Sequence, residues 1–262
     1  MEAAPAIALD ELQASAALRT RLDRKYVVEW EQLTALLGAL SDTHRVLEIA
    51  GHRVFRYESV YFDSPDLLAF RAHLQRRRRR YKVRSRHYVD TGLRTFEVKL
   101  KGKRGETVKH QMPYGDEDLD RVSEHAQRFL AERLGEAYPR IDLPQLSPTL
   151  RNGYQRFTLT AGIERLTCDF DLSYGHADID VPGLDPRYVI VESKCEKGLG
   201  AADRELRRLG VRPVGCSKYC VGVGLLRADA KVNELRWLLN RYFAGNDRRA
   251  EHPPALPTTP NA

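Results

Sequence analysis

Apolar and charged residues alternate along several stretches of the chain. In residues 95–101, Phe96, Val98 and Leu100 occupy every second position, and charged or polar residues stand between them. Residues 165–171 repeat this pattern. Because successive side chains of an extended chain point to opposite faces, a period of two predicts strands with one apolar face and one charged face.

The same pattern predicts an α+β fold dominated by antiparallel strands. Short polar turns at residues 90–92 and 103–105 favour hairpins between neighbouring strands. Ser64 is the expected N-cap of a helix that starts with Pro65. The predicted strands cover residues 22–29, 54–62, 78–89, 93–101, 106–113, 150–160, 162–171, 187–195 and 218–225. The predicted helices cover residues 30–40, 65–74, 117–135, 200–209 and 229–243.

We expect a single domain over residues 16–243, since all-β barrels of roughly 200–250 residues commonly stay undivided. Residues 1–15 are predicted to be a flexible N-terminus. Residues 244–262 are polar and rich in proline, which predicts a disordered tail. No apolar stretch approaches the roughly 18 residues of a membrane span, and the chain has no basic start of a secretory signal. A cytoplasmic location is therefore expected.

The charged faces of several predicted strands would form one continuous basic surface. One interpretation is a sheet with this surface in water. The other is a closed or nearly closed antiparallel β-barrel with a charged lumen and helices packed on the outside. The amphipathic stretch at residues 117–135 favours the barrel, because its apolar face needs an outward-facing apolar surface to cover. The basic residues on these faces are Lys25, Arg84, Arg86, Lys99, Lys109, Arg151, Arg165 and Lys218.

The distribution of charge points to a polyanionic partner. The 262 residues include 43 Lys and Arg against 36 Asp and Glu, a net charge of +7. Residues 71–109 alone hold 15 basic and 3 acidic residues, or +12, so the remainder carries −5. A basic segment in an otherwise acidic chain indicates nucleic acid, an anionic membrane or a polyphosphorylated ligand.

Carboxylates among the basic residues narrow this choice. Glu97 lies two residues from Lys99 on one strand face, and Glu192 lies two residues from Lys194 on another. Each pair alone fits an ordinary ion pair. Together they favour a metal–phosphate site, because Mg²⁺ or Mn²⁺ takes one or two protein carboxylates and completes its coordination with phosphate and water.

Several short motifs carry a resemblance to a known family. They occur in order between about residues 20 and 226, as LDRKY at 22–26, YESVYFDSP at 57–65, RRRYKVRSR at 78–86, FEVKLK at 96–101, RGETVK at 104–109 and CSKY at 216–219. In these segments the chain resembles the VTC domain, the polyphosphate polymerase domain of the eukaryotic vacuolar transporter chaperone complex. That domain also occurs as stand-alone bacterial proteins and belongs to the triphosphate tunnel metalloenzymes, alongside the CYTH group.

The resemblance implies an antiparallel β-tunnel that binds a triphosphate and a divalent metal ion, Mn²⁺ or Mg²⁺. Glu192 matches the principal metal-binding glutamate, and Glu97 is a second candidate ligand. Asp23 stands where the CYTH group carries glutamates, so metal binding from the first strand is not implied. The expected catalytic residues are Lys25, Arg84, Arg86, Glu192 and Lys218. The expected substrate-binding residues are Lys99, Lys109, Arg151, Arg165 and Lys194.

The implied reaction is transfer of the γ-phosphoryl group of ATP, or another nucleoside triphosphate, onto a growing polyphosphate chain. The attacking phosphate oxygen is already anionic, so no strong general base is required. A triphosphatase of the same fold is one alternative, and a non-catalytic polyphosphate- or nucleic-acid-binding module is another. The consecutive arginines Arg76–Arg80 have no aromatic residues interleaved with them on which bases could stack, so we expect no nucleic-acid partner. The resemblance leaves room for a membrane-protein partner on another chain.

Overall fold

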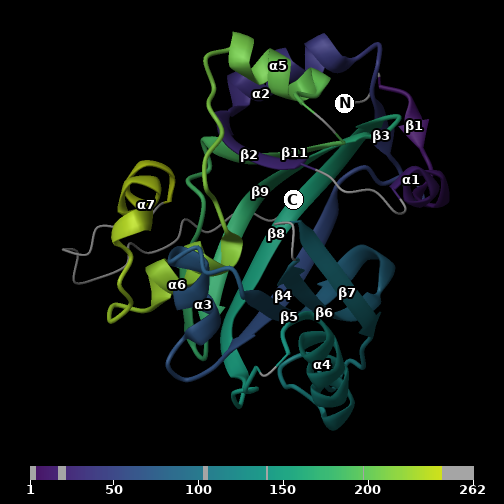
Figure 1. The fold of residues 1–262 in the computed structure, drawn as a ribbon. Coiled ribbons are helices and arrows are strands. Elements are labelled where there is room, and N and C mark those ends of the chain that lie inside the picture. Colours follow the sequence, from purple (N-terminus) through teal and green to yellow (C-terminus); the bar gives the residue numbers. More distant parts are fainter. Residues whose placement is uncertain (1–3, 17–21, 103–105, 140, 197, 244–262) are drawn as a thin grey trace.

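The computed structural model describes residues 4–16, 22–102, 106–139, 141–196 and 198–243. Its centre is an eleven-stranded sheet whose main path runs β2-β11-β9-β8-β4-β5-β6-β7 (Figure 1). Every neighbouring pair on this path is antiparallel. The strands of the path are β2 (Leu22–Glu29), β4 (Phe55–Asp63), β5 (Tyr81–Tyr88), β6 (Leu93–Lys101), β7 (Thr107–Pro113), β8 (Ser147–Ala161), β9 (Glu164–His176) and β11 (Tyr188–Cys195).

The predicted α+β fold with antiparallel strands and outer helices is confirmed. Strands β2 and β6 have the bounds that alternation predicts, and the other strands of the path lie at their predicted places. Residues of β2 and β7, the two ends of the path, line one cavity, so the sheet curls around a common space. Among the described residues no backbone pairing joins β2 to β7, so the curled sheet keeps an open seam.

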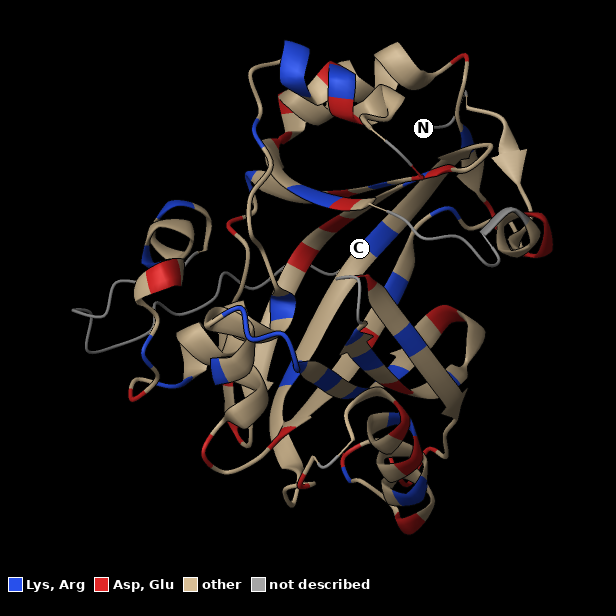
Figure 2. Cartoon of the chain, viewed as in Figure 1, with Lys and Arg blue, Asp and Glu red and all other residues tan. Residues whose placement is uncertain are grey.

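Helices cover the outer, apolar face of the curled sheet. Helix α4 (Glu124–Ala137) places Leu130 and Leu134 in one buried cluster with Phe96 and Val98 of β6. Helices α2 (Trp30–Leu40) and α5 (Ala201–Arg208) cover β2, β9 and β11 in a second cluster. Apolar residues therefore point outward into helix-covered cores, and charged residues of the opposite strand face line the cavity inside the curl. Figure 2 shows where the charged residues lie along the strands.

The C-terminal part of the fold differs from the sequence-based prediction. Residues 218–225, predicted as a strand, form helix α6 (Lys218–Leu226). The two valines of this segment have a high β-propensity, but the Ser217 hydroxyl caps the helix by accepting the backbone N–H of Cys220 at 3.3 Å. Glycine at position 222 allows α6 to pack closely against Tyr174, since a Cβ at this position would lie 2.6 Å from the Tyr174 ring. Tertiary contacts thus override the β-propensity of the valines.

Three other predicted helices have different boundaries in the structure. Helix α3 (Leu68–Leu74) starts later than predicted because the buried Asp63 carboxylate accepts the backbone N–H groups of Ala69 and Phe70, both at 2.9 Å. Helix α4 starts at Glu124, with Ser123 as its N-cap. The predicted 229–243 helix is a 3₁₀ turn followed by α7 (Arg236–Tyr242).

The described part of the N-terminal segment contains two short elements. Helix α1 (Leu9–Ala16) buries Leu12, and β1 (Ala6–Ile7) pairs with β3 (Arg45–Leu47) in parallel. The short strand β10 (Ile179–Pro182) pairs with β9. The predicted tail over residues 244–262 lies outside the described residues. No helix in the described part of the chain is long and apolar enough to cross a membrane.

The close contact at Gly222 gives a stability prediction. Gly222→Ala adds a methyl group against Tyr174 and Leu150, and overpacking of this kind lowers the free energy of unfolding by about 1–3 kcal/mol. Gly135→Ala is the matched control, because nothing lies within 4 Å of a Cβ at this position of α4. Urea unfolding should show a lower midpoint for Gly222→Ala and an unchanged or higher one for Gly135→Ala. Equal midpoints would contradict the packing described for α6.

Candidate functional site

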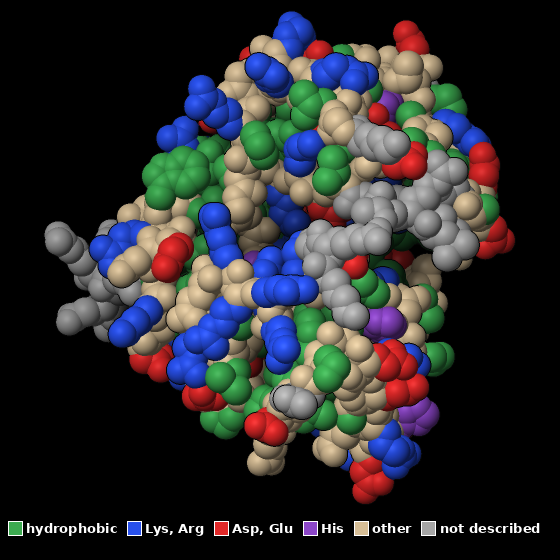
Figure 3. Space-filling model, viewed as in Figure 1, with side chains coloured by type: hydrophobic (Ala, Val, Ile, Leu, Met, Phe, Trp, Pro, Cys, Tyr) green, Lys and Arg blue, Asp and Glu red, His purple; other side chains and the backbone are tan. Residues whose placement is uncertain are grey.

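The concave side of the sheet encloses a cavity of about 2050 Å³. On one face of the molecule, Lys and Arg side chains gather around a central hollow (Figure 3). The cavity receives basic side chains from strands across the sheet and from α6. Its basic lining includes Lys25, Lys82, Arg84, Arg86, Lys99, Lys101, Lys109, Arg156, Arg165, Lys194 and Lys218.

Strand parity and register explain why these charges meet. On β5, Lys82, Arg84 and Arg86 share the inner face because side chains alternate along a strand. Antiparallel pairing then sets Arg84 opposite Glu97 of β6. It likewise sets Glu192 of β11 opposite Lys25 of β2, two residues far apart in the sequence.

Glu97 is a fully buried anion that holds two cations of the cavity. Its carboxylate accepts a hydrogen bond from Arg84 Nε at 2.8 Å and lies 3.3 Å from Lys109 Nζ. Burial alone raises the pKa of Glu97, but Arg84 and the neighbouring cations outweigh burial and hold that pKa well below its usual value. The ionised Glu97 therefore fixes the direction in which the Arg84 guanidinium points.

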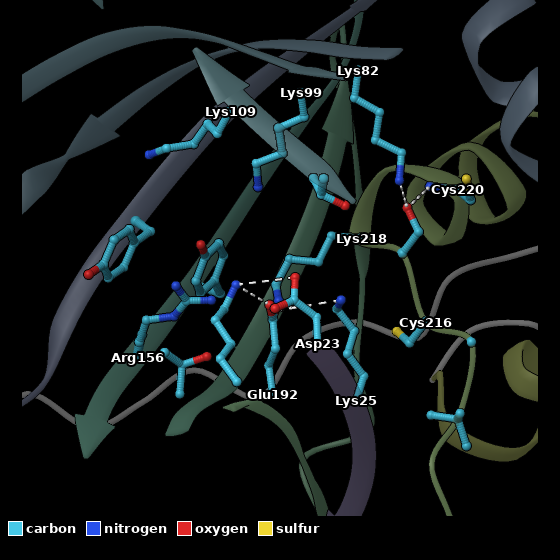
Figure 4. A pocket seen from close by; sticks show the side chains of 18 of the residues that line it. Asp23, Lys25, Lys82, Lys99, Lys109, Arg156, Glu192, Cys216, Lys218 and Cys220 are labelled. Atoms are coloured by element: carbon cyan, nitrogen blue, oxygen red, sulfur yellow. Dashed lines mark hydrogen bonds and ion pairs between the residues drawn. The ribbon is translucent and has the colours of Figure 1, made fainter. Parts of the chain in front are cut away.

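Glu192 forms a second anionic centre, which faces the cavity (Figure 4). Its carboxylate lies 2.7 Å from Lys194 Nζ and 3.7 Å from Lys25 Nζ. The Asp23 carboxylate lies 3.6 Å from the same Lys194 ammonium. Burial opposes ionisation of Glu192, yet Lys25 and Lys194 lower its pKa well below the usual value. The carboxylates of Glu192 and Asp23 thus flank one ammonium, that of Lys194, at the cavity wall.

Asp169 is a third buried anion, and the sequence did not single it out. Arg156 donates to it through Nη2 at 2.8 Å, and Lys218 of α6 also donates to it. Burial raises the pKa of Asp169, but Arg156 and Lys218 outweigh burial and lower it to about 2. This carboxylate therefore ties α6 to the sheet and orients two cations of the lining.

Tyrosine rings hold the arginines of the inner face. Tyr57 and Tyr154 stack with centroids 5.2 Å apart. The Arg156 guanidinium lies 5.3 Å from both ring centroids, and Arg86 lies 5.4 Å from that of Tyr57. The Lys218 ammonium lies 4.6 Å from the Tyr154 centroid. The rings therefore orient these cations without neutralising their charge.

Three lysines of the lining, Lys82, Lys99 and Lys109, have lowered pKa values. Repulsion from Arg84, together with burial, places the pKa of Lys99 well below its usual value. Burial lowers the pKa of Lys82, whose Nζ donates to the Ser217 hydroxyl at 2.8 Å. An ammonium that is costly in the empty cavity becomes favourable once an anion enters.

The structure brings most of the predicted site residues together but sets Arg151 apart. Arg151 pairs with Val60 on the opposite face of the sheet, and its guanidinium lies 3.5 Å from Asp120. Arg156, further along β8, lines the cavity in its place. Arg156 lies two residues from Tyr154 and therefore on the same face of β8. This shared parity is the signal in the sequence that could have identified Arg156. The predicted residues that line the cavity are Lys25, Arg84, Arg86, Lys99, Lys109, Arg165, Glu192, Lys194 and Lys218.

Glu192 is the residue that best fits a divalent metal ion. It faces the cavity next to Asp23, whereas the carboxylate of Glu97 is fully buried and already bonded to Arg84 and Lys109. Among the described residues no group of three or more His, Cys, Asp or Glu side chains converges. A metal ion at Glu192 would therefore draw most of its ligands from phosphate and water, which is the usual mode for Mg²⁺.

Comparison with known proteins gives one strong match. The family model described as the VTC domain matches residues 20–227. No curated protein sequence matches the chain significantly.

Solved structures resemble the chain more distantly. A candidate adenylate cyclase from Bacillus halodurans is 14% identical, with a TM-score of 0.48 over 76% of this chain and 95% of that one. A candidate adenylate cyclase from Vibrio parahaemolyticus is 12% identical, with a TM-score of 0.45 over 78% and 97%. A candidate adenylyl cyclase from Hippeastrum, described as having a dominant triphosphatase activity, is 14% identical, with a TM-score of 0.44 over 78% and 95%.

The shared anion Asp169 gives a prediction on acid stability. Asp169→Asn leaves the Arg156 and Lys218 cations without their buried partner, so we expect the free energy of unfolding at neutral pH to fall by about 3 kcal/mol. Since the pKa of Asp169 is lowered from 3.8 to about 2, this contribution is complete above the unfolded value and disappears as the pH falls toward 2. Urea unfolding should show the gap between wild type and variant narrowing over that range.

The control for this experiment is Asp171→Asn on the same strand. Asp171 is exposed and accepts a hydrogen bond from Gln155 Nε2 at 2.7 Å, and its φ of +50° suits asparagine. This variant should unfold like the wild type. A gap for Asp169→Asn that stays constant between neutral pH and pH 2 would contradict the assigned role of Asp169.

The lowered pKa of Lys99 gives a prediction on ligand binding. Binding of inorganic triphosphate should be accompanied by proton uptake at Lys99, because the negative charge of the ligand favours the ammonium form of this lysine. The affinity of the protein for triphosphate should therefore fall as the pH rises. Calorimetry in buffers of different ionisation enthalpy measures this uptake, which Lys99→Met should reduce and Lys231→Met, an exposed control, should not. Equal uptake by wild type and Lys99→Met would exclude Lys99 as the proton acceptor.

Proposed function

The chain belongs to the VTC domain family, and from this premise we propose that it is a metal-dependent polyphosphate polymerase. It would transfer the γ-phosphoryl group of ATP onto the end of an inorganic polyphosphate chain inside the cavity. The observation that carries the proposal is a cavity lined by basic residues from opposite ends of the sheet and from α6, with the Glu192 carboxylate facing into it. Glu97 and Asp169 are fully buried in ion pairs and are not among the residues that line the cavity.

Charge is the main obstacle to this reaction. The donor triphosphate and the end of the acceptor chain are both strongly anionic and repel each other on approach. Fixed cations in a partly enclosed cavity offset this repulsion more effectively than water does, because they need no reorganisation as charge develops. Carboxylates and tyrosine rings already orient Arg84, Arg86 and Arg156, so these positive charges are preorganised around the cavity.

The lysines and Glu192 have separate roles in the proposal. Lys25, Lys99 and Lys218 act as point charges on phosphate oxygens, and an entering phosphate favours the ammonium form of Lys99, whose pKa is lowered by Arg84 and by burial. Glu192 would hold the divalent ion, which supplies Lewis-acid polarisation of a phosphoryl oxygen when it is bound. The acceptor oxygen is already ionised, so no residue needs to remove a proton from it.

The size of the cavity favours a polymerase over a triphosphatase. At about 2050 Å³, the cavity exceeds the roughly 300–1,000 Å³ of typical small-molecule sites. A triphosphatase has to hold one triphosphate and a water molecule. A polymerase has to hold a nucleotide and the end of a polyphosphate chain at the same time, and the cavity has room for both.

The proposal predicts chain growth that depends on Glu192. Purified protein incubated with ATP and either Mn²⁺ or Mg²⁺ should produce chains longer than triphosphate, resolved on a gel. Glu192→Gln should reduce turnover by about 10–100-fold through loss of metal affinity while inorganic triphosphate still binds. Glu132→Gln, on an exposed part of α4, is the matched control and should retain wild-type turnover.

The remaining outcomes separate the alternatives. Release of orthophosphate without chain growth would replace the polymerase by a triphosphatase. Binding of polyphosphate with no turnover with either metal would identify a binding module. Full activity of Glu192→Gln would exclude Glu192 as the metal ligand.

A further inference from the structure

Helix α7 contributes to the cavity although it lies beyond the residues that match the family. The match ends at residue 227, and α7 spans Arg236–Tyr242. Even so, Trp237, Arg241 and Tyr242 line the same cavity as Glu192. The part of the cavity that α7 forms is therefore a property of this chain which the VTC match does not describe.

Trp237 is an exposed aromatic residue at the wall of this cavity. It is 59% exposed, although burying a tryptophan side chain is strongly favourable. Its ring meets Tyr242 edge-on at 5.6 Å and 88°. The Arg241 guanidinium lies 5.8 Å from the Trp237 centroid and 5.5 Å from that of Tyr242. These contacts leave much of the indole surface open to a ligand.

Tyr188 links this aromatic group to the proposed metal position. Its ring lies 5.0 Å from that of Tyr242 in an edge-on contact, and Tyr188 also lines the cavity. Tyr188 and Glu192 share one face of β11, four residues apart, which corresponds to about 13 Å along the strand. Tyr188 therefore lies toward the start of β11 from Glu192, and the aromatic residues Tyr242 and Trp237 of α7 adjoin it there.

We propose that Trp237, Tyr242 and Tyr188, with Arg241, form the site for the nucleobase of the donor nucleotide. This inference rests on the proposed function, since it assigns the base of the substrate whose phosphates Glu192 and the basic wall would hold. Polyphosphate offers only charged oxygens and gains nothing from an indole. A nucleobase gains about 1–3 kcal/mol from stacking on an aromatic side chain. Because every base has a π-face, the site accepts adenine and guanine alike.

Fluorescence tests this site directly, because the chain contains only two tryptophans. Trp30, the other tryptophan, does not line the cavity, so Trp30→Phe leaves Trp237 as the only indole emitter. ATP and GTP should both quench this emission on binding, whereas inorganic triphosphate should bind without quenching. ATP that binds without changing the emission would overturn the assignment.

Affinity measurements test the energetic part. Trp237→Ala should weaken ATP binding roughly 10-fold, the equivalent of one stacked base, and leave the binding of inorganic triphosphate unchanged. Trp30→Ala removes the other exposed tryptophan and should leave both affinities unchanged. Unchanged ATP affinity in Trp237→Ala, with triphosphate still bound, would overturn the base site alone. Failure of the wild type to bind inorganic triphosphate would overturn the proposed function as well.

Discussion

Mutual repulsion among buried cations is the constraint on which the rest of this structure depends. Arginines and lysines face one cavity from strands across the sheet, and burial makes their repulsion stronger. Three carboxylates offset it locally, with Glu97 beside Arg84, Asp169 beside Arg156 and Lys218, and Glu192 beside Lys25 and Lys194. The remaining positive charge gives the cavity its affinity for anions. The same residues therefore lower the stability of the folded protein through repulsion and raise its affinity for an anionic ligand.

Much of the sheet could be predicted from the sequence because alternation and strand parity are local properties. β2 and β6 follow from alternation alone, and the inward row on β5 follows from parity. The α6 region could not be predicted in this way. Its valines favour a strand, whereas the cap at Ser217 and the tertiary packing of the helix, including the close approach of Gly222 to Tyr174, favour α6.

The site was harder to predict than the sheet because it depends on register and on distant contacts. Arg151 and Arg156 are both arginines of β8, and pairing with Val60 places the first on the outer face. The pairing of β8 with β9 shifts register between Gly153 and Gln155, which no local pattern shows. The role of Asp169 depends on Lys218, 49 residues away, and the aromatic group of α7 meets the cavity only in three dimensions.

The pairing of β2 with β11 has a consequence for how the chain is made. Lys25 leaves the ribosome well before Glu192, yet the two strands lie side by side. The basic segment at residues 71–109 emerges before Asp169 and Glu192 exist to balance it. A nascent chain of this kind carries uncompensated positive charge until β9 and β11 are added, and contacts between such distant residues fold slowly. Polyanions in the cell therefore meet the basic strands before the cavity that selects among them is complete.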